Sequence, residues 1–358
     1  MNLTAHSYLS EIETYKPGKA KVGNNSNIVK LSSNENALGS SPKAFEAYTK
    51  HAKEMFRYAD GSCSSLREAI AKKNKIDAGK IVCGAGSDEI LALLTAAFAG
   101  VGDEIIYSEH GFLMYPISAK KVGAVAIKAK EHNLKTNINN VLAAITKKTK
   151  IIFIANPNNP TGSYLTDAEI AKLINGTPKD VLIVLDHAYE EFVGVSDYPN
   201  AIKLVNDHEN VVVTRTFSKI YGLASLRIGW CYSSLKIADI LNKVRGPFNV
   251  GGPAQFAAVA ALEDEEFAEK SIKHNKKWLK ILFKEFADIP KIHAYPSVAN
   301  FILLDFATLD FCQKANETLL AKGIILREMT TYHLPNCLRL SIGTEEENLR
   351  VLDILKKL

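Results

Sequence analysis

Between about residues 45 and 250, short apolar segments alternate with segments whose apolar residues recur at helical spacing. The short segments are apolar on both faces, which is typical of strands covered by helices on both sides. "LTDAEIAKLI", between two of them, opens with the capping box Thr166-x-x-Glu169 and predicts the start of a helix. This strand–helix–strand order predicts an α/β fold with a mostly parallel sheet between helices. The strand-like segments are "KIVCG", "DEIIYSE", "KIIFIANP", "DVLIVLDHAY" and "NVVVTRTF".

The two ends of the chain do not follow this alternation of strand and helix patterns. The first 44 residues are polar and rich in turn residues, and they predict an arm with little core of its own. A long helical pattern from Pro253 to about Phe286 precedes three short strand patterns and a final helix, which starts at the capping box Thr344-x-x-Glu347. We therefore expect an arm (1–44), a large domain (45–252), and a linking helix with a small α+β domain (253–358).

Composition excludes several classes of function. The net charge is only +5 and the lysines are scattered, so we expect no nucleic-acid partner. The longest apolar segment, "ILALLTAAFAGV", is too short to span a bilayer, so we expect no membrane association. The five cysteines are far apart and form no C-x-x-C pair, which predicts no metal site and a reducing compartment. With no signal-peptide pattern at the N-terminus, we expect a cytoplasmic protein.

Polar side chains follow two neighbouring strand patterns, where ligands bind in open parallel sheets. Asn159 lies in the stiff loop "NPNNPTG", which could also be an ordinary turn. Asp186 ends "VLIVLD", and Tyr189 follows three residues later. A carboxylate so close to a buried strand needs a cation or good hydrogen-bond donors, although an N-cap role for Asp186 is also open.

Two further turns carry groups that suit an anion. "GAGSDEI" joins a strand to a helix N-terminus, where backbone N–H groups bind anions. Its glycines are not spaced as G-x-G-x-x-G, so a single phosphate fits better than a dinucleotide. A third strand end supplies hydroxyls, an arginine and a lysine, a set that suits a carbonyl compound carrying a phosphate. These groups are Thr216, Ser218, Lys219 and Arg227.

Taken together, the strand ends match the chemical groups of one ligand. It has a phosphate, a basic ring nitrogen that needs a carboxylate, a phenolic oxygen that needs donors, and an aldehyde that needs a lysine. These are the groups of pyridoxal phosphate, which we predict as the cofactor.

Motifs along nearly the whole chain support this prediction. In order they are "KLSSNENALGSSP", "FRYADGSCSSLREAIA", "GAGSDEILALLTAAF", "NPNNPTG", "LDHAYEEF", "RTFSKIYGLASLRIG", "ANFIL", "ILREM" and "LRLSIGTEEEN". By these motifs the chain resembles the fold-type I pyridoxal-phosphate-dependent (class II) aminotransferases, and among them most closely the histidinol-phosphate aminotransferases. The combination is specific, whereas several of the pieces alone would be weak.

The resemblance implies roles for the residues above. Lys219 would bond to the cofactor's aldehyde and carry the proton between the substrate α-carbon and the cofactor. Asp186 would pair with the pyridinium nitrogen, while Asn159 and Tyr189 would hydrogen-bond to the phenolic oxygen. Tyr115 would stack on the ring. The phosphate would be held by Gly86, Ser87, Asp88, Thr216, Ser218 and Arg227.

The resemblance also implies partners and a reaction. Tyr58 matches a tyrosine that reaches the cofactor phosphate of a second subunit, which implies a homodimer. Tyr15, Arg327 and Arg339 would contact the substrate, one site accepting histidinol phosphate and glutamate in turn. The implied reaction transfers an amino group between L-histidinol phosphate and 2-oxoglutarate, giving imidazole acetol phosphate and L-glutamate, in histidine biosynthesis.

Other functions remain open on the sequence. The nearest alternative is an aromatic aminotransferase for tyrosine or phenylalanine, or an enzyme with both specificities. A threonine-phosphate decarboxylase is a further candidate. A non-enzymatic regulator would need an appended DNA-binding module, and a dehydrogenase would need different glycine spacing. The chain departs from the family pattern at Ala37, Gly111, His187 and Ser225.

Overall fold

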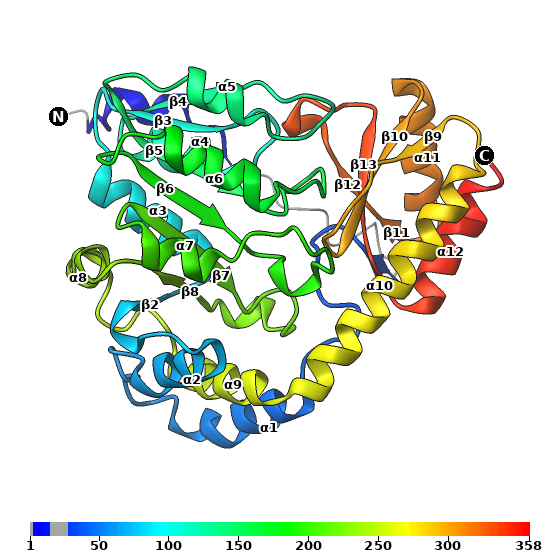
Figure 1. Cartoon of the computed structure of the whole chain (residues 1–358). Coiled ribbons are helices and arrows are strands. Elements are labelled where there is room, and N and C mark those ends of the chain that lie inside the picture. The colour runs from blue at the N-terminus through cyan, green and yellow to red at the C-terminus, as the bar shows by residue number, and fades with distance from the viewer. Residues whose placement is uncertain (1–2, 15–27) are drawn as a thin grey trace.

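The computed structural model describes residues 3–14 and 28–358, and its largest element is a seven-stranded sheet (Figure 1). Strand β8 runs antiparallel to both of its neighbours, and the other adjacent pairs are parallel. The predicted mostly parallel sheet is therefore confirmed. In sheet order the strands are β2 (Ile81–Gly84), β8 (Gly229–Tyr232), β7 (Val211–Thr216), β6 (Leu182–Asp186), β5 (Thr149–Ala155), β3 (Glu104–Ser108) and β4 (Val125–Ala129).

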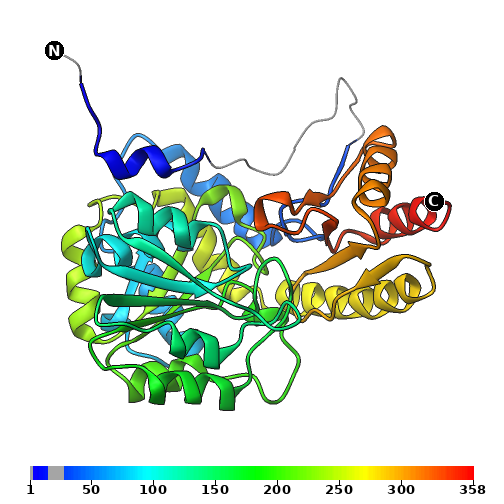
Figure 2. The same cartoon turned by 90° about the horizontal axis from the view of Figure 1, so that it is seen from above.

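Helices cover both faces of this sheet, so its central strands are buried on two sides (Figure 2). Within β5, Ile151 and Phe153 join one apolar core, while Ile152 and Ile154 join the other. This explains why the strand is a continuous apolar run. One face carries α3 (Ser87–Phe98), α4 (Met114–Lys121) and α8 (Leu235–Val244). The other carries α2 (Ser64–Asn74), α5 (Ile138–Ala143), α6 (Asp167–Gly176), α7 (Ala201–Asp207) and α9 (Gly252–Glu263), with α1 (Pro42–His51) against α9.

Capping residues set several helix boundaries. Both predicted capping boxes are present, at Thr166 before α6 and at Thr344 before α12 (Glu345–Leu355). The single long helix predicted after residue 253 is instead two helices, α9 and α10 (Glu265–Ala287). Asp264 separates them, because its side chain accepts a hydrogen bond from the Phe267 N–H and caps α10.

The C-terminal part forms a second, smaller sheet whose adjacent strands are all antiparallel, in the order β12 (Arg327–Glu328), β13 (Cys337–Ser341), β10 (Phe301–Phe306) and β9 (Ile292–Ala294). Helices α10, α11 (Leu309–Ala321) and α12 pack around it. Strand β1 (Val29–Lys30) pairs in parallel with β11 (Ile324–Ile325). The chain that follows β1 therefore starts beside the small domain and runs toward the large one. Our division at residues 44 and 252 remains a proposal.

Short 3₁₀ helices complete the secondary structure: η1 (Ser7–Glu11), η2 (Ala52–Glu54), η3 (Ala78–Lys80), η4 (Glu190–Phe192), η5 (Ala224–Leu226) and η6 (Thr330–Tyr332). In the part of the chain that the structure describes, no helix has the length and hydropathy needed to cross a membrane.

Candidate active site

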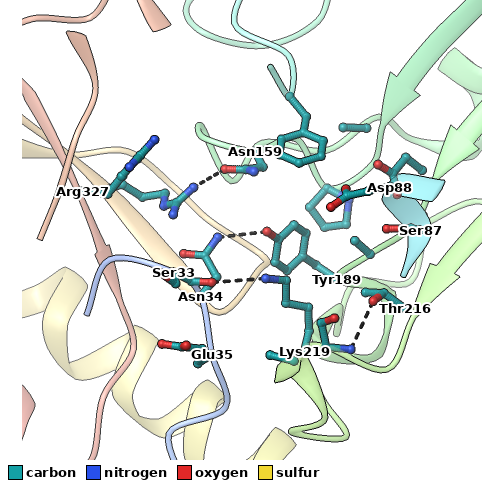
Figure 3. Close-up of a pocket in the computed structure, with 18 of the residues that line it drawn as sticks. Ser33, Asn34, Glu35, Ser87, Asp88, Asn159, Tyr189, Thr216, Lys219 and Arg327 are labelled. Carbon is teal, nitrogen blue, oxygen red and sulfur yellow. Dashed lines mark hydrogen bonds between the residues drawn. The ribbon is translucent and has the colours of Figure 1, made fainter. Parts of the chain in front are cut away.

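A cavity of about 280 Å³ lies where the ends of β5, β6 and β7 face the small domain (Figure 3). These strands are neighbours in the sheet, so the polar residues that follow them meet at one edge. The small domain and residues 32–35 form the opposite side. The predicted residues that line the cavity are Ser87, Asp88, Asn159, Asp186, Tyr189, Thr216, Ser218, Lys219, Arg227, Arg327 and Arg339.

Of the other predicted residues, Gly86, Tyr58 and Tyr115 are not among those that line the cavity. Tyr58 is 84% exposed on the surface and stacks on Phe248 at 4.6 Å between ring centroids, so it does not reach the cavity of its own chain. Tyr15 lies outside the described residues. Tyr115 is fully buried and does not line the cavity.

The position of Tyr115 corrects its predicted role as the ring-stacking residue. Its ring stacks on Phe153 with a centroid distance of 4.8 Å, and its hydroxyl donates to Asp186 Oδ2 at 2.9 Å. Tyr115 lies in the first turn of α4, on the side that packs into the apolar core, and this packing buries its ring. Phe112, three residues earlier, is the aromatic side chain that lines the cavity.

One end of the cavity has the groups that bind a phosphate. Ser87 starts α3, whose free N–H groups and dipole favour an anion. Arg227 Nη1 lies 3.4 Å from Ser218 Oγ, and Arg227 Nη2 lies 3.4 Å from Asp88 Oδ2. Gly86 has φ +84°, a conformation that favours glycine, and a Cβ there would lie 2.4 Å from Arg227 Nη2 and would displace this arginine. These residues fit the phosphate of the predicted cofactor.

Asp186 is a nearly buried carboxylate at the end of β6. Burial raises its pKa, while hydrogen bonds from Tyr115 and from Thr214 Oγ1, at 3.0 Å from Oδ1, act in the opposite direction. A protonated ring nitrogen in the cavity would supply the cation that this carboxylate requires. The chemistry of this site therefore fits the pyridine ring of the predicted cofactor.

Lys219 follows β7, and its amine reaches the centre of the cavity. Its Nζ donates to the Ser33 carbonyl at 3.2 Å and lies 5.6 Å from the centroid of the Tyr189 ring. Burial and, as a smaller effect, the positive charge of Arg339 lower the pKa of Lys219 to about 8. At pH 7 an amine with a pKa of about 8 is neutral roughly a tenth of the time, far more often than an ordinary lysine, and in that form it can act as a nucleophile or a base.

Asn159 is oriented by a residue of the small domain. Its Oδ1 accepts a hydrogen bond from Arg339 Nη1, which leaves its amide Nδ2 as a donor. Arg339 Nη2 also donates to the Ser32 carbonyl at 2.9 Å. Asn156 steadies the loop, because its side chain makes two hydrogen bonds with the backbone of Leu165, at 2.9 and 3.1 Å.

Sequence reasoning assigned no role to several residues that line the cavity, including Ser32, Ser33, Asn34, Phe112 and Tyr332. The motif "KLSSNENALGSSP" drew attention to the arm, but its polar residues resemble those of any turn-rich segment. Long-range contacts, among them the pairing of β1 with β11 and the hydrogen bond from Arg339 to the Ser32 carbonyl, bring residues 32–35 over the cavity.

Comparisons with known proteins agree with this site. The family model described as "Aminotransferase class I and II" matches residues 26–355. A histidinol-phosphate aminotransferase of Paramagnetospirillum magneticum is 50% identical, covering 98% of this chain and 96% of its own. The corresponding protein of Maricaulis maris is 43% identical, covering 99% and 98%.

The fold has a close counterpart among solved structures. The histidinol-phosphate aminotransferase of Sinorhizobium meliloti, solved in complex with pyridoxal-5′-phosphate, superposes with a TM-score of 0.90. It is 24% identical, and the match covers 99% of this chain and 96% of that one. At this identity the likeness supports the fold alone.

The fold, the cavity and these matches define a class of protein: the chain belongs to the class I and II aminotransferase family. It is a transaminase that uses pyridoxal phosphate, as the strand ends predicted.

Proposed function

We propose that the chain transfers the amino group between L-histidinol phosphate and 2-oxoglutarate, in histidine biosynthesis. Its two relatives named above carry this activity in their names and match nearly end to end. The observation that carries the proposal in the structure is a pair of arginines, Arg327 and Arg339, that line the cavity. Figure 3 shows Arg327 on the small-domain side. Arginine binds phosphate and carboxylate equally well through its planar fork, so one site can take both substrates in turn.

The residues around the cavity have different roles in the proposed reaction. Bound pyridoxal phosphate supplies an aldehyde for the amine and a protonated ring that accepts electrons from the α-carbon. Lys219 would hold the cofactor through its aldehyde, and its amine would move the proton at the substrate α-carbon. Asp186 would keep the ring nitrogen charged, and Phe112 would contact the ring. Asn159 and Tyr189 would donate hydrogen bonds to the phenolic oxygen.

The remaining groups orient the cofactor. We assign the phosphate to the N-terminus of α3 and to Arg227 with its neighbouring hydroxyls. The support is the close approach of Arg227 to Ser218 Oγ and to Gly86, described above. Holding the phosphate at this end would direct the aldehyde toward Lys219.

A half-reaction screen tests the proposed substrate. The protein loaded with pyridoxal phosphate is mixed separately with histidinol phosphate, tyrosine, phenylalanine and glutamate, and conversion of the bound cofactor is followed by absorbance. We expect kcat/KM for histidinol phosphate to exceed that for either aromatic amino acid by about 10²-fold or more, because its phosphate can bind Arg327 and Arg339 and the aromatic side chains carry no such anion.

Matched substrates and variants sharpen this screen. Histidinol, which lacks the phosphate, should convert far more slowly than histidinol phosphate, and Arg327→Lys should narrow that difference. The proposal is wrong if tyrosine or phenylalanine converts as fast as histidinol phosphate. Release of carbon dioxide from threonine phosphate without an oxo-acid would favour a decarboxylase instead.

We also propose that the working unit is a homodimer. Large apolar side chains are exposed together in one region around α1, η2 and α9. They are Phe45, Met55, Phe56, Tyr58, Phe248 and Phe256. Single exposed apolar residues are normal on a protein surface, but a group of them is typical of a protein–protein contact. A second copy covering this surface would bring its Tyr58 toward the phosphate end of the first copy's cavity, as the family resemblance implies.

Mixed subunits test this arrangement. Lys219→Ala and Tyr58→Ala homodimers are each expected to be poorly active, but a dimer with one chain of each kind has one complete site. Random mixing should therefore restore about a quarter of the wild-type sites, given two-fold symmetry. Sedimentation velocity gives the oligomeric state independently. Mixing that restores no activity would show that Tyr58 does not act across subunits.

A cytoplasmic location remains part of the proposal. All five cysteines are free and buried, which agrees with the reducing compartment expected from their spacing.

A further inference from the structure

The segment that follows β1 crosses the cavity in a fixed conformation. Asn34 in this segment is 1% exposed and has φ 55°, a left-handed conformation that asparagine adopts more readily than most residues. Asn300 holds the backbone here, because its Nδ2 donates to the carbonyls of Asn34, at 3.1 Å, and Glu35, at 3.3 Å. These hydrogen bonds fix the position of the Asn34 backbone, and the Asn34 side chain lines the cavity.

The two ends of the Asn34 side-chain amide have different hydrogen-bond partners. Its Nδ2 donates to the Tyr189 hydroxyl at 2.9 Å, a contact visible in Figure 3. At the other end of the amide, Ser341 Oγ donates to Asn34 Oδ1 at 3.0 Å and accepts the Asn34 backbone N–H at 2.8 Å. Ser341 accepts that N–H and keeps its own hydrogen for Oδ1, which agrees with the orientation that places Nδ2 at Tyr189.

Because Asn34 is the donor in this bond, the Tyr189 hydroxyl is the acceptor. A phenolic hydroxyl has one hydrogen to donate and lone pairs that accept. Since Tyr189 accepts from Asn34, its hydrogen is not used in that bond and can be donated into the cavity. Tyr189 is nearly buried and lines the cavity beside Lys219, so the cavity is where an acceptor can meet it.

We propose that Asn34 and Ser341 are positioning residues that keep Tyr189 a hydrogen donor to the cofactor's phenolic oxygen. The Lys219 nitrogen, once bonded to the aldehyde carbon, shares its proton with that oxygen. A donor from Tyr189 weakens the oxygen's hold on the proton, so the nitrogen loses it at a lower pH. The inference rests on the proposed contact between Tyr189 and the phenolic oxygen, and it extends the site to two residues that act through Tyr189.

Asn34→Asp is the most direct test. Aspartate keeps the size and tolerates the left-handed backbone, but its carboxylate can only accept, so Tyr189 should turn its hydrogen away from the cavity. The readout is a pH titration of the visible absorption of the loaded protein. We expect the midpoint to rise by about one pH unit, the scale of one lost hydrogen bond. Tyr189→Phe should raise it similarly, and Ser341→Ala should raise it less.

A double-mutant cycle separates positioning from the added negative charge. In the Tyr189→Phe background, Asn34→Asp should cause no further shift, because the hydroxyl through which it acts is gone. A shift that persists there would come from charge alone and overturn the proposal. If Tyr189→Phe raises the midpoint but neither Asn34→Asp nor Ser341→Ala does, the positioning role is wrong while the Tyr189 contact stands.

The proposed contact can also fail without affecting the assigned reaction. If Tyr189→Phe leaves the midpoint unchanged, Tyr189 does not donate to the phenolic oxygen, and the roles of Asn34 and Ser341 fall with it. The half-reaction with histidinol phosphate would still report on the proposed function. Ser341→Ala removes only one hydroxyl, so it keeps the question answerable if Asn34→Asp folds poorly.

Discussion

Lys219→Ala should reduce kcat/KM for transamination by about 10⁴-fold or more, because one substitution removes both the group that bonds to the aldehyde and the base that moves the α-proton. The amine is the only lysine nitrogen among the residues that line the described cavity. Its lowered pKa of about 8 suits both tasks, whereas an ordinary surface lysine would stay charged.

Single-turnover absorbance with histidinol phosphate measures this effect. Lys273→Ala is the matched control, since Lys273 is exposed on α10 and pairs only with Glu269 on the same helix. The control should keep wild-type rates. A high concentration of a small primary amine should restore part of the Lys219→Ala activity, because the cavity left by the side chain can admit it. A Lys219→Ala protein within about tenfold of wild type would contradict the assigned base role.

Asp186→Asn should lower kcat by on the order of 10²–10³-fold, the usual effect of removing one fixed charge from a water-excluded site. Asparagine preserves the shape. Its one oxygen can accept from either Tyr115 or Thr214, and its NH2 group can donate to the other hydroxyl, so the fold should survive. What is lost is the negative charge that would hold a proton on the ring nitrogen. The effect should therefore appear mainly in kcat.

Steady-state kinetics at saturating cofactor measures the Asp186→Asn effect. Asp207→Asn provides the control, because Asp207 is exposed at the end of α7 and pairs with Lys203. Wild-type kcat in Asp186→Asn would show that the ring nitrogen does not depend on this carboxylate. Weaker cofactor binding with unchanged kcat would give Asp186 a binding role only.

Much of the fold was predictable because its signals are local. The doubly apolar runs of β5, β6 and β7 and the capping boxes at Thr166 and Thr344 all appear as expected. The break at Asp264 was missed because helical spacing continues through it, and only the cap divides the pattern. Strand β8 was missed because four residues inside a motif give little periodicity.

The site was predictable where residues follow strand ends, since topology alone brings those ends together. It was not predictable where long-range packing decides the position of a side chain. Tyr115 matched a stacking role by its motif, yet the packing of α4 on β5 buries it behind Asp186. Asn34 meets Ser341 across 307 residues of sequence, and no local pattern encodes such a contact.

The central claim is that Lys219 carries the cofactor in this cavity. Reducing the loaded protein with borohydride fixes the bond between the lysine and the cofactor, and peptide mass mapping then locates the added pyridoxyl group. The account predicts one labelled peptide, with the label on Lys219, and no label in Lys219→Ala. Stoichiometric label on another lysine, or none at all after saturation with pyridoxal phosphate, would contradict it.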